Sequence, residues 1–108
     1  MAHFNEDVAC PIAATLEYIG GRWKTIVLYY LSSGTRRFGE IAARIPPISK
    51  KVLVQQLKEL ERDGLVTRQQ MTNRPSHVAY SLTELGKSLS PVFKEMSLWG
   101  KQNILSKR

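Results

Sequence analysis

This sequence of 108 residues contains little cysteine, little histidine and no long apolar run. A single cysteine excludes a disulfide within the chain, as expected of a protein kept in a reducing cytoplasm. One cysteine and two scattered histidines do not supply the ligands of a metal site, so we expect no metal and no cofactor. The missing apolar run and the missing signal-peptide pattern favour a cytoplasmic location without a membrane span.

The residue patterns of catalysis are also missing. His77 has no acidic neighbour in the sequence that could orient it, and Gly20-Gly21 lacks the spacing of a phosphate-binding loop. The aromatic residues Trp23, Tyr29 and Tyr30 are better explained by packing than by a ligand box. We therefore expect no catalytic residue and no enzyme.

Positive charge is abundant, and it is confined to the middle of the chain. The net charge is +7. From Arg22 to Arg74 there are eleven lysines and arginines against four acidic residues, whereas the two flanks together hold five of each sign. This distribution indicates a polyanion as the partner of the middle segment more directly than it indicates general solubility.

The stretch from Ser49 to Gly64 predicts a helix with well-defined ends. Ser49 is a favourable N-cap, and Gly64 tolerates the left-handed conformation that ends many helices. Leu53, Leu57 and Leu60 form one apolar stripe. The opposite face suits phosphates and base edges, although a solvated surface helix is the alternative. That face carries Lys51, Gln55, Lys58 and Arg62, with Lys50 beside the N-terminus.

Three further helices are predicted before this stretch. The third, Phe38 to Ile45, ends at Pro46-Pro47, and the turn and charged helix that follow complete the order of a helix-turn-helix element. The first helix begins at Cys10-Pro11 and is expected to bury Ile12, Leu16 and Ile19. The second spans Trp23 to Leu31 with Trp23, Ile26, Val27, Tyr30 and Leu31 inward. A short extended segment follows at Thr35 to Phe38, with a small strand as one interpretation.

After Gly64 the apolar period changes to about two, which predicts a β-hairpin. Its strands are residues 65–71 and 77–82, and the turn is Thr72 to Ser76. A hairpin directly after a helix-turn-helix element is a wing in DNA-binding folds. Arg74 at its tip is placed to enter a minor groove or touch a phosphate, with a solvated loop arginine as the alternative.

The last helix is predicted to begin at Thr83 or Ser81, the latter within a capping box that ends at Glu84, and Pro91 must kink or split it. Its apolar surface exceeds what a small domain buries alone, so we infer a dimer seam, with packing on the chain's own core as the competing account. The stripe is formed by Leu85, Leu89, Val92, Met96 and Trp99, with Phe93 and Ile104 beside it.

Six short motifs follow one another between residues 10 and 86, and Pro91 and Trp99-Gly100 come after them. They are Cys10-Pro11, the runs 20–24 (GGRWK), 37–41 (RFGEI), 48–53 (ISKKVL), 57–66 (LKELERDGLV) and 80–86 (YSLTELG). In this order and spacing the chain resembles the HxlR family of bacterial winged-helix transcription regulators over roughly residues 10 to 100.

The fold that the resemblance implies is mainly α with a small β-hairpin (α+β), a winged helix-turn-helix whose N- and C-terminal helices form a dimer seam. A flexible tail at 1–9 precedes a single domain at 10–108. Within it the helix-turn-helix spans 38–64, the wing 65–82 and the C-terminal dimerisation helix 83–105. The expected seam residues are Ile12, Leu16, Val92, Phe93, Met96 and Trp99.

The implied function is DNA-binding regulation of transcription, more by repression than by activation, from an inverted-repeat operator bound by a homodimer. Gln55 is suited to pair with adenine and Lys51 to donate to guanine, in major grooves about 34 Å apart. The expected DNA contacts are Ser49, Lys50, Lys51, Gln55, Lys58, Arg62, Arg37 and Arg74. A basic winged-helix module for protein interaction, or a nonspecific DNA binder, is the alternative.

Cys10 is the candidate sensor. Several members of the family respond to oxidants or electrophiles through the matching cysteine, and a helix N-terminus stabilises a thiolate. A small oxidant or electrophile is therefore the expected effector, with an inert packing residue as the alternative. Because the chain has no second cysteine, a Cys10–Cys10′ bridge, a mixed disulfide, alkylation or no switch all stay open. Arg22 or Lys24 would assist if the fold brings them near.

Overall fold

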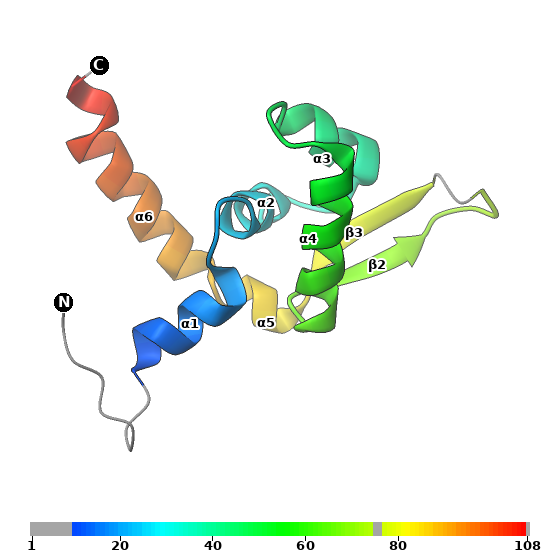
Figure 1. Ribbon diagram of the computed structural model, residues 1–108, viewed down its shortest axis with the longest axis horizontal. Helices are drawn as coiled ribbons and strands as arrows, with labels where there is room; N and C mark the ends of the chain where they lie inside the picture. Colours follow the sequence, from blue (N-terminus) through cyan, green and yellow to red (C-terminus); the bar gives the residue numbers. More distant parts are fainter. Residues whose placement is uncertain (1–9, 75–76, 108) are drawn as a thin grey trace.

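The computed structural model describes residues 10–74 and 77–107 of the chain (Figure 1). The predicted tail at 1–9, Pro75-Ser76 of the wing and Arg108 at the end of the predicted domain lie outside the described residues. In chain order the elements are α1 (Pro11–Ile19), α2 (Lys24–Leu31), β1 (Arg36–Arg37), α3 (Phe38–Arg44), α4 (Lys50–Arg62), β2 (Val66–Gln70), β3 (Val78–Leu82), α5 (Glu84–Lys87), α6 (Ser90–Asn103) and the 3-10 turn η1 (Leu105–Lys107).

The helices α3 and α4 form the predicted helix-turn-helix element, and both ends of α4 follow from the sequence. The side chain of Ser49 accepts a hydrogen bond from the backbone N–H of Val52 at 3.1 Å, as an N-cap should. Gly64 has φ of +77°, a left-handed conformation that a glycine adopts without steric cost. The helix therefore begins and ends where its local residues allow.

The strands form one antiparallel sheet with the order β1-β3-β2. The hairpin pairs Val66 with Leu82 and Gln70 with Val78, and β1 adds Arg36 opposite Tyr80 on the other edge of β3. The hairpin projects from one side of the molecule, while α1 and α6 extend from the opposite side (Figure 1). The hairpin and the two terminal helices α1 and α6 thus extend from opposite sides of the core.

The C-terminal region is divided in two, as Pro91 predicted. Pro91 lies in the first turn of α6, where its missing N–H costs no hydrogen bond. The expected cap at Ser81 is wrong because Ser81 belongs to β3. Thr83 caps α5 instead, accepting from the N–H of Gly86 at 3.1 Å and donating to the carbonyl of Gly64 at 2.6 Å.

The hydrophobic core lies where α2, α3, α4 and the sheet meet, and it corrects several expectations. Ile26 is exposed, whereas Leu28, which was not expected inside, is fully buried. Of the predicted buried stripe of α1 only Ile19 is buried, and Ile12 (71% exposed) and Leu16 lie on the surface. Phe93, expected at the dimer seam, is 3% exposed and belongs to the chain's own core.

Candidate nucleic-acid interface

The solvent face of α4 presents the side chains that the sequence predicted for it. Leu53, Leu57 and Leu60 are buried to 1% exposure or less, which fixes the rotation of the helix about its axis. All four predicted residues of the opposite face are consequently exposed: Lys51, Gln55, Lys58 and Arg62. A face of two lysines, an arginine and an amide can donate to phosphate oxygens and to base acceptors.

The N-terminus of α4 adds backbone donors to this face. Ser49 uses its oxygen to accept from Val52, so its hydroxyl hydrogen can still donate to another acceptor. Lys50 and Lys51, both exposed, occupy the first turn. Helix N-termini attract phosphate because their first N–H groups point outward and the helix dipole is positive there.

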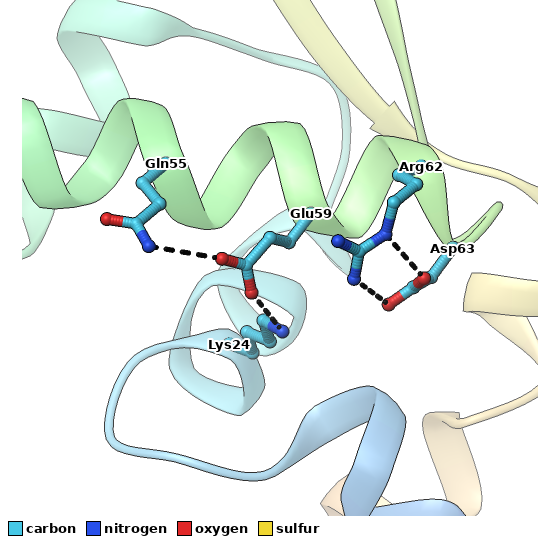
Figure 2. A network of polar contacts seen from close by, with 5 residues as sticks. All are labelled: Lys24, Gln55, Glu59, Arg62 and Asp63. Atoms are coloured by element: carbon cyan, nitrogen blue, oxygen red, sulfur yellow. Dashed lines mark hydrogen bonds and ion pairs between the residues drawn. The ribbon is translucent and has the colours of Figure 1, made fainter.

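Arg62 is paired with an acidic neighbour, which the sequence analysis did not predict. Its Nε and one terminal nitrogen donate to the two carboxylate oxygens of Asp63 at 3.1 and 3.3 Å (Figure 2). These hydrogen bonds raise the pKa of Arg62 above its ordinary value. To contact DNA, Arg62 would have to share or exchange this partner.

Gln55 is tied to a network that reaches into the core. Its Nε2 donates to Oε2 of Glu59 at 3.3 Å, and Oε1 of Glu59 lies 2.7 Å from Nζ of Lys24 (Figure 2). The hydrogen bond from Lys24 and then that from Gln55 lower the pKa of Glu59, so its carboxylate stays charged at neutral pH. The exposed amide of Gln55 therefore shares the Glu59 carboxylate with the buried ammonium of Lys24.

The two remaining predicted DNA contacts lie outside α4. Arg37 is exposed at the N-cap of α3, where its backbone N–H donates to Oε1 of Glu40 at 2.8 Å. Arg74 is exposed in the wing loop, and its backbone N–H donates to Thr72 at 3.1 Å. The hydroxyl of Thr72 is also 2.9 Å from Nδ1 of His77, so the imidazole of His77 is a hydrogen-bond partner within the wing loop.

Four of the predicted seam residues line one apolar groove of about 600 Å³ between α1, α2 and α6. Phe93 does not take part because it packs inward, and Trp99 is 60% exposed further along α6. The residues brought together are Ile12, Leu16, Val92 and Met96.

Cys10 is partly buried at the N-cap of α1. The assistance considered from Lys24 is not available in this arrangement because its ammonium is bound to Glu59. The guanidinium of Arg22 lies over the ring of Trp23, 4.5 Å from its centroid.

Sequence reasoning missed the contacts that link Lys24 and Glu59 to Gln55. The spacing of four between Gln55 and Glu59 was a readable signal, since such side chains meet on a helix. Nothing local indicated that Lys24 is buried against them.

Two observations concern what this part of the chain does not contain. Within residues 10–74 and 77–107, no cluster of three or more histidine, cysteine or acidic side chains could hold a metal ion. In the same ranges no helix is long and apolar enough to cross a membrane.

Comparison with known proteins places this geometry among transcription regulators. A family model described as HxlR-like helix-turn-helix matches residues 18–108. The uncharacterized HTH-type transcriptional regulator YdeP of Bacillus subtilis is 46% identical over 93 residues, which cover 86% of this chain and 73% of the relative.

Two solved structures are similar over nearly their whole length. The redox regulator HypR in its reduced form has a TM-score of 0.83 at 40% identity, covering 92% of this chain and 100% of that one. The quinone-bound YodB from B. subtilis has a TM-score of 0.74 at 40% identity, covering 87% of this chain and 99% of that one.

Proposed function

The chain belongs to the HxlR-like helix-turn-helix family of winged-helix transcription regulators, and from this premise we propose that it represses transcription as a homodimer bound to an inverted-repeat operator. The observation that carries the proposal is the exposed face of α4. Lys51 and Gln55 lie one helical turn apart on this face, and the leucine stripe on the opposite face is fully buried. Such a face fits the major groove, whose base edges offer acceptors to lysine and a paired donor and acceptor to glutamine.

The homodimer is supported by apolar surface that the described chain leaves uncovered. Ile12, Leu16 and Met96 are more than half exposed beside the groove between α1 and α6. Contiguous exposed apolar surface marks interaction sites in soluble proteins. A second copy would cover both helices of each chain, and its two-fold axis would demand an inverted repeat in the DNA.

The proposed function is tested with reduced protein and DNA from upstream of its own gene. Fluorescence anisotropy compares this fragment with a scrambled duplex at the same salt concentration. We expect binding to the native fragment to be tighter by about a thousandfold or more, the range of site-specific regulators. Equal binding, followed by no preferred site in a pool of random duplexes, would contradict the proposal and favour a nonspecific DNA binder or a protein-interaction module.

We further propose that a small oxidant or electrophile acts through Cys10. The relatives support this: HypR is named a redox regulator, with reduced and oxidized structures, and YodB has quinone-bound and diamide-treated structures. Cys10 is the one thiol of the chain and is partly buried at the start of α1, next to the helix surface assigned to the dimer seam. A group added to it would disturb that surface.

The Cys10→Ser variant gives the test of sensing. Treating the wild-type protein with diamide is expected to weaken operator binding about tenfold or more, while the serine variant binds equally before and after treatment. Anisotropy measures the binding. Repeating the treatment with glutathione present supplies the second thiol of a mixed disulfide, and non-reducing electrophoresis with intact mass separates that product from a Cys10–Cys10′ bridge. A serine variant that still responds to diamide would eliminate Cys10 as the sensor.

A further inference from the structure

Lys24 is buried although it carries a charge. It is the first residue of α2, is 8% exposed, and places Nζ 2.7 Å from Oε1 of Glu59 on α4. Burying a cation is costly unless a partner compensates it. The side chain of Glu59 is 27% exposed, so the ion pair joins a buried end to a surface end.

The surface end of this pair holds Gln55. One carboxylate of Glu59 receives Lys24 on Oε1 and the amide of Gln55 on Oε2, the latter at 3.3 Å (Figure 2). An ionised carboxylate only accepts hydrogen bonds. It therefore orients the NH₂ group of Gln55 toward itself, and the amide oxygen of Gln55 points away from Glu59. The amide is thereby given one of its two orientations.

This orientation bears directly on base reading. To recognise adenine, an amide accepts from N6 with its oxygen and donates to N7 with its nitrogen. The NH₂ group has two hydrogens, so one can stay on Glu59 while the other serves the base. A side chain oriented in advance also loses less rotational freedom when it binds.

The position of Lys24 is fixed from the side of α1. The hydroxyl of Thr25 donates to the carbonyl of Ile19 at 2.9 Å, which ties the start of α2 to the end of α1. Arg22 packs over Trp23 in the loop between them. The ion pair is therefore anchored on a constrained backbone.

We propose that Lys24 is a positioning residue for sequence reading, which acts through Glu59 to hold the amide of Gln55 and does not itself touch DNA. This rests on the proposed function, since it requires that Gln55 reads a base. A Lys24 that only fastens α2 to α4 would change stability and overall affinity alike, without a change at one base position.

The test is selection of bound sequences from a pool of random DNA duplexes. It is run with the wild type, Lys24→Met, Gln55→Ala and the double variant. We expect Gln55→Ala to lose the preference for adenine at one position by about 5- to 150-fold, the worth of a bidentate pair. Lys24→Met should lose about fivefold or more at the same position only, and add nothing in the double variant, because coupled residues are not additive.

Three further variants complete the design. Lys24→Arg keeps the positive charge and should retain the wild-type preference for adenine at that position. Lys87→Met removes an exposed ion pair with Glu84 on α5 and should leave every position unchanged. Glu59→Gln repeats the test from the other partner if Lys24→Met fails to fold, because its neutral amide no longer dictates one orientation of Gln55.

The outcomes separate this inference from the proposed function. A wild type that selects no motif overturns the proposed function, and the inference with it. A wild-type motif that Gln55→Ala leaves unchanged overturns the inference alone. The same holds for a Lys24→Met variant that folds, binds and keeps full preference at the Gln55 position.

A measurement without DNA tests the same link. In the wild type, the side-chain amide NMR signals of Gln55 should move with pH as Glu59 is protonated. Because Lys24 lowers the pKa of Glu59, Lys24→Met should move this transition to higher pH. Signals of Gln55 that do not follow Glu59, or a transition that Lys24→Met leaves in place, would overturn the proposal.

Discussion

The double variant Lys51→Ala plus Gln55→Ala is expected to lose its discrimination between operator and scrambled DNA while keeping its fold. Each good contact to a base is worth about 1–3 kcal/mol of discrimination, so two independent contacts account for about 2–6 kcal/mol. Both side chains are exposed, and neither contributes to the leucine stripe that packs α4. Anisotropy against both duplexes measures the loss, and circular dichroism with thermal unfolding verifies the fold.

A matched control removes an exposed lysine elsewhere. Lys87→Ala changes an exposed side chain of α5 and should leave discrimination as it is in the wild type. Nonspecific binding should decrease only slightly in the test variant. The slope of the logarithm of the binding constant against the logarithm of the salt concentration should become shallower by about one, because one phosphate-accessible cation is lost. Full discrimination in the test variant would mean that α4 does not read sequence through these residues.

Gly86→Ala is expected to cost about 1–3 kcal/mol of unfolding free energy or more. A Cβ at this position would lie 2.3 Å from the carbonyl oxygen of Leu65 and 3.2 Å from Cδ2 of Leu82. The first neighbour is backbone, so no change of rotamer relieves the clash. The junction that must yield is the one where Thr83 bonds to Gly64, between the end of α4 and the start of α5.

The glycine at position 39 provides the comparison. An added Cβ there meets no atom within 4 Å, in an exposed position of α3, so Gly39→Ala should be neutral or stabilise by up to about 1 kcal/mol. Chemical denaturation of both variants at one protein concentration separates the two cases. Equal stability of Gly86→Ala and wild type would show that Leu65 can move aside without cost.

The helix α4 could be predicted because its signals are local. Ser49 caps it, Gly64 ends it, and three leucines at helical spacing decide which face is buried. The strand at Arg36–Arg37 lies within the segment expected to be extended or a small strand, but its pairing was not predicted. Its partner is β3, far along the chain, and no local residue encodes that pairing.

Apolar periodicity was less reliable where nearly every residue is apolar or where a partner could cover the surface. In α2 both Ile26 and Leu28 satisfy a helical pattern, and only the packed structure shows that Leu28 is the buried one. On α1 the stripe of Ile12 and Leu16 is real, but it points away from the core of its own chain. A pattern in sequence identifies an apolar face and not what covers it.

The burial of Lys24 could not be predicted from the sequence, for an energetic reason. A lysine is predicted outside because burying its charge is unfavourable, and its compensation by Glu59 is visible only once α2 and α4 pack together. The assignments of individual residues to bases and phosphates stay predictions, since they depend on the shape of a bound duplex.

The two tryptophans give the molecule separate optical reporters. Trp23 is half-buried beneath the guanidinium of Arg22, in the loop that leads to Lys24, whereas Trp99 stands largely in solvent on α6. An indole in water emits at longer wavelengths than one in an apolar surrounding. Intrinsic fluorescence can therefore follow the covering of α6 through one ring and changes near the α1–α2 loop through the other, without any attached dye.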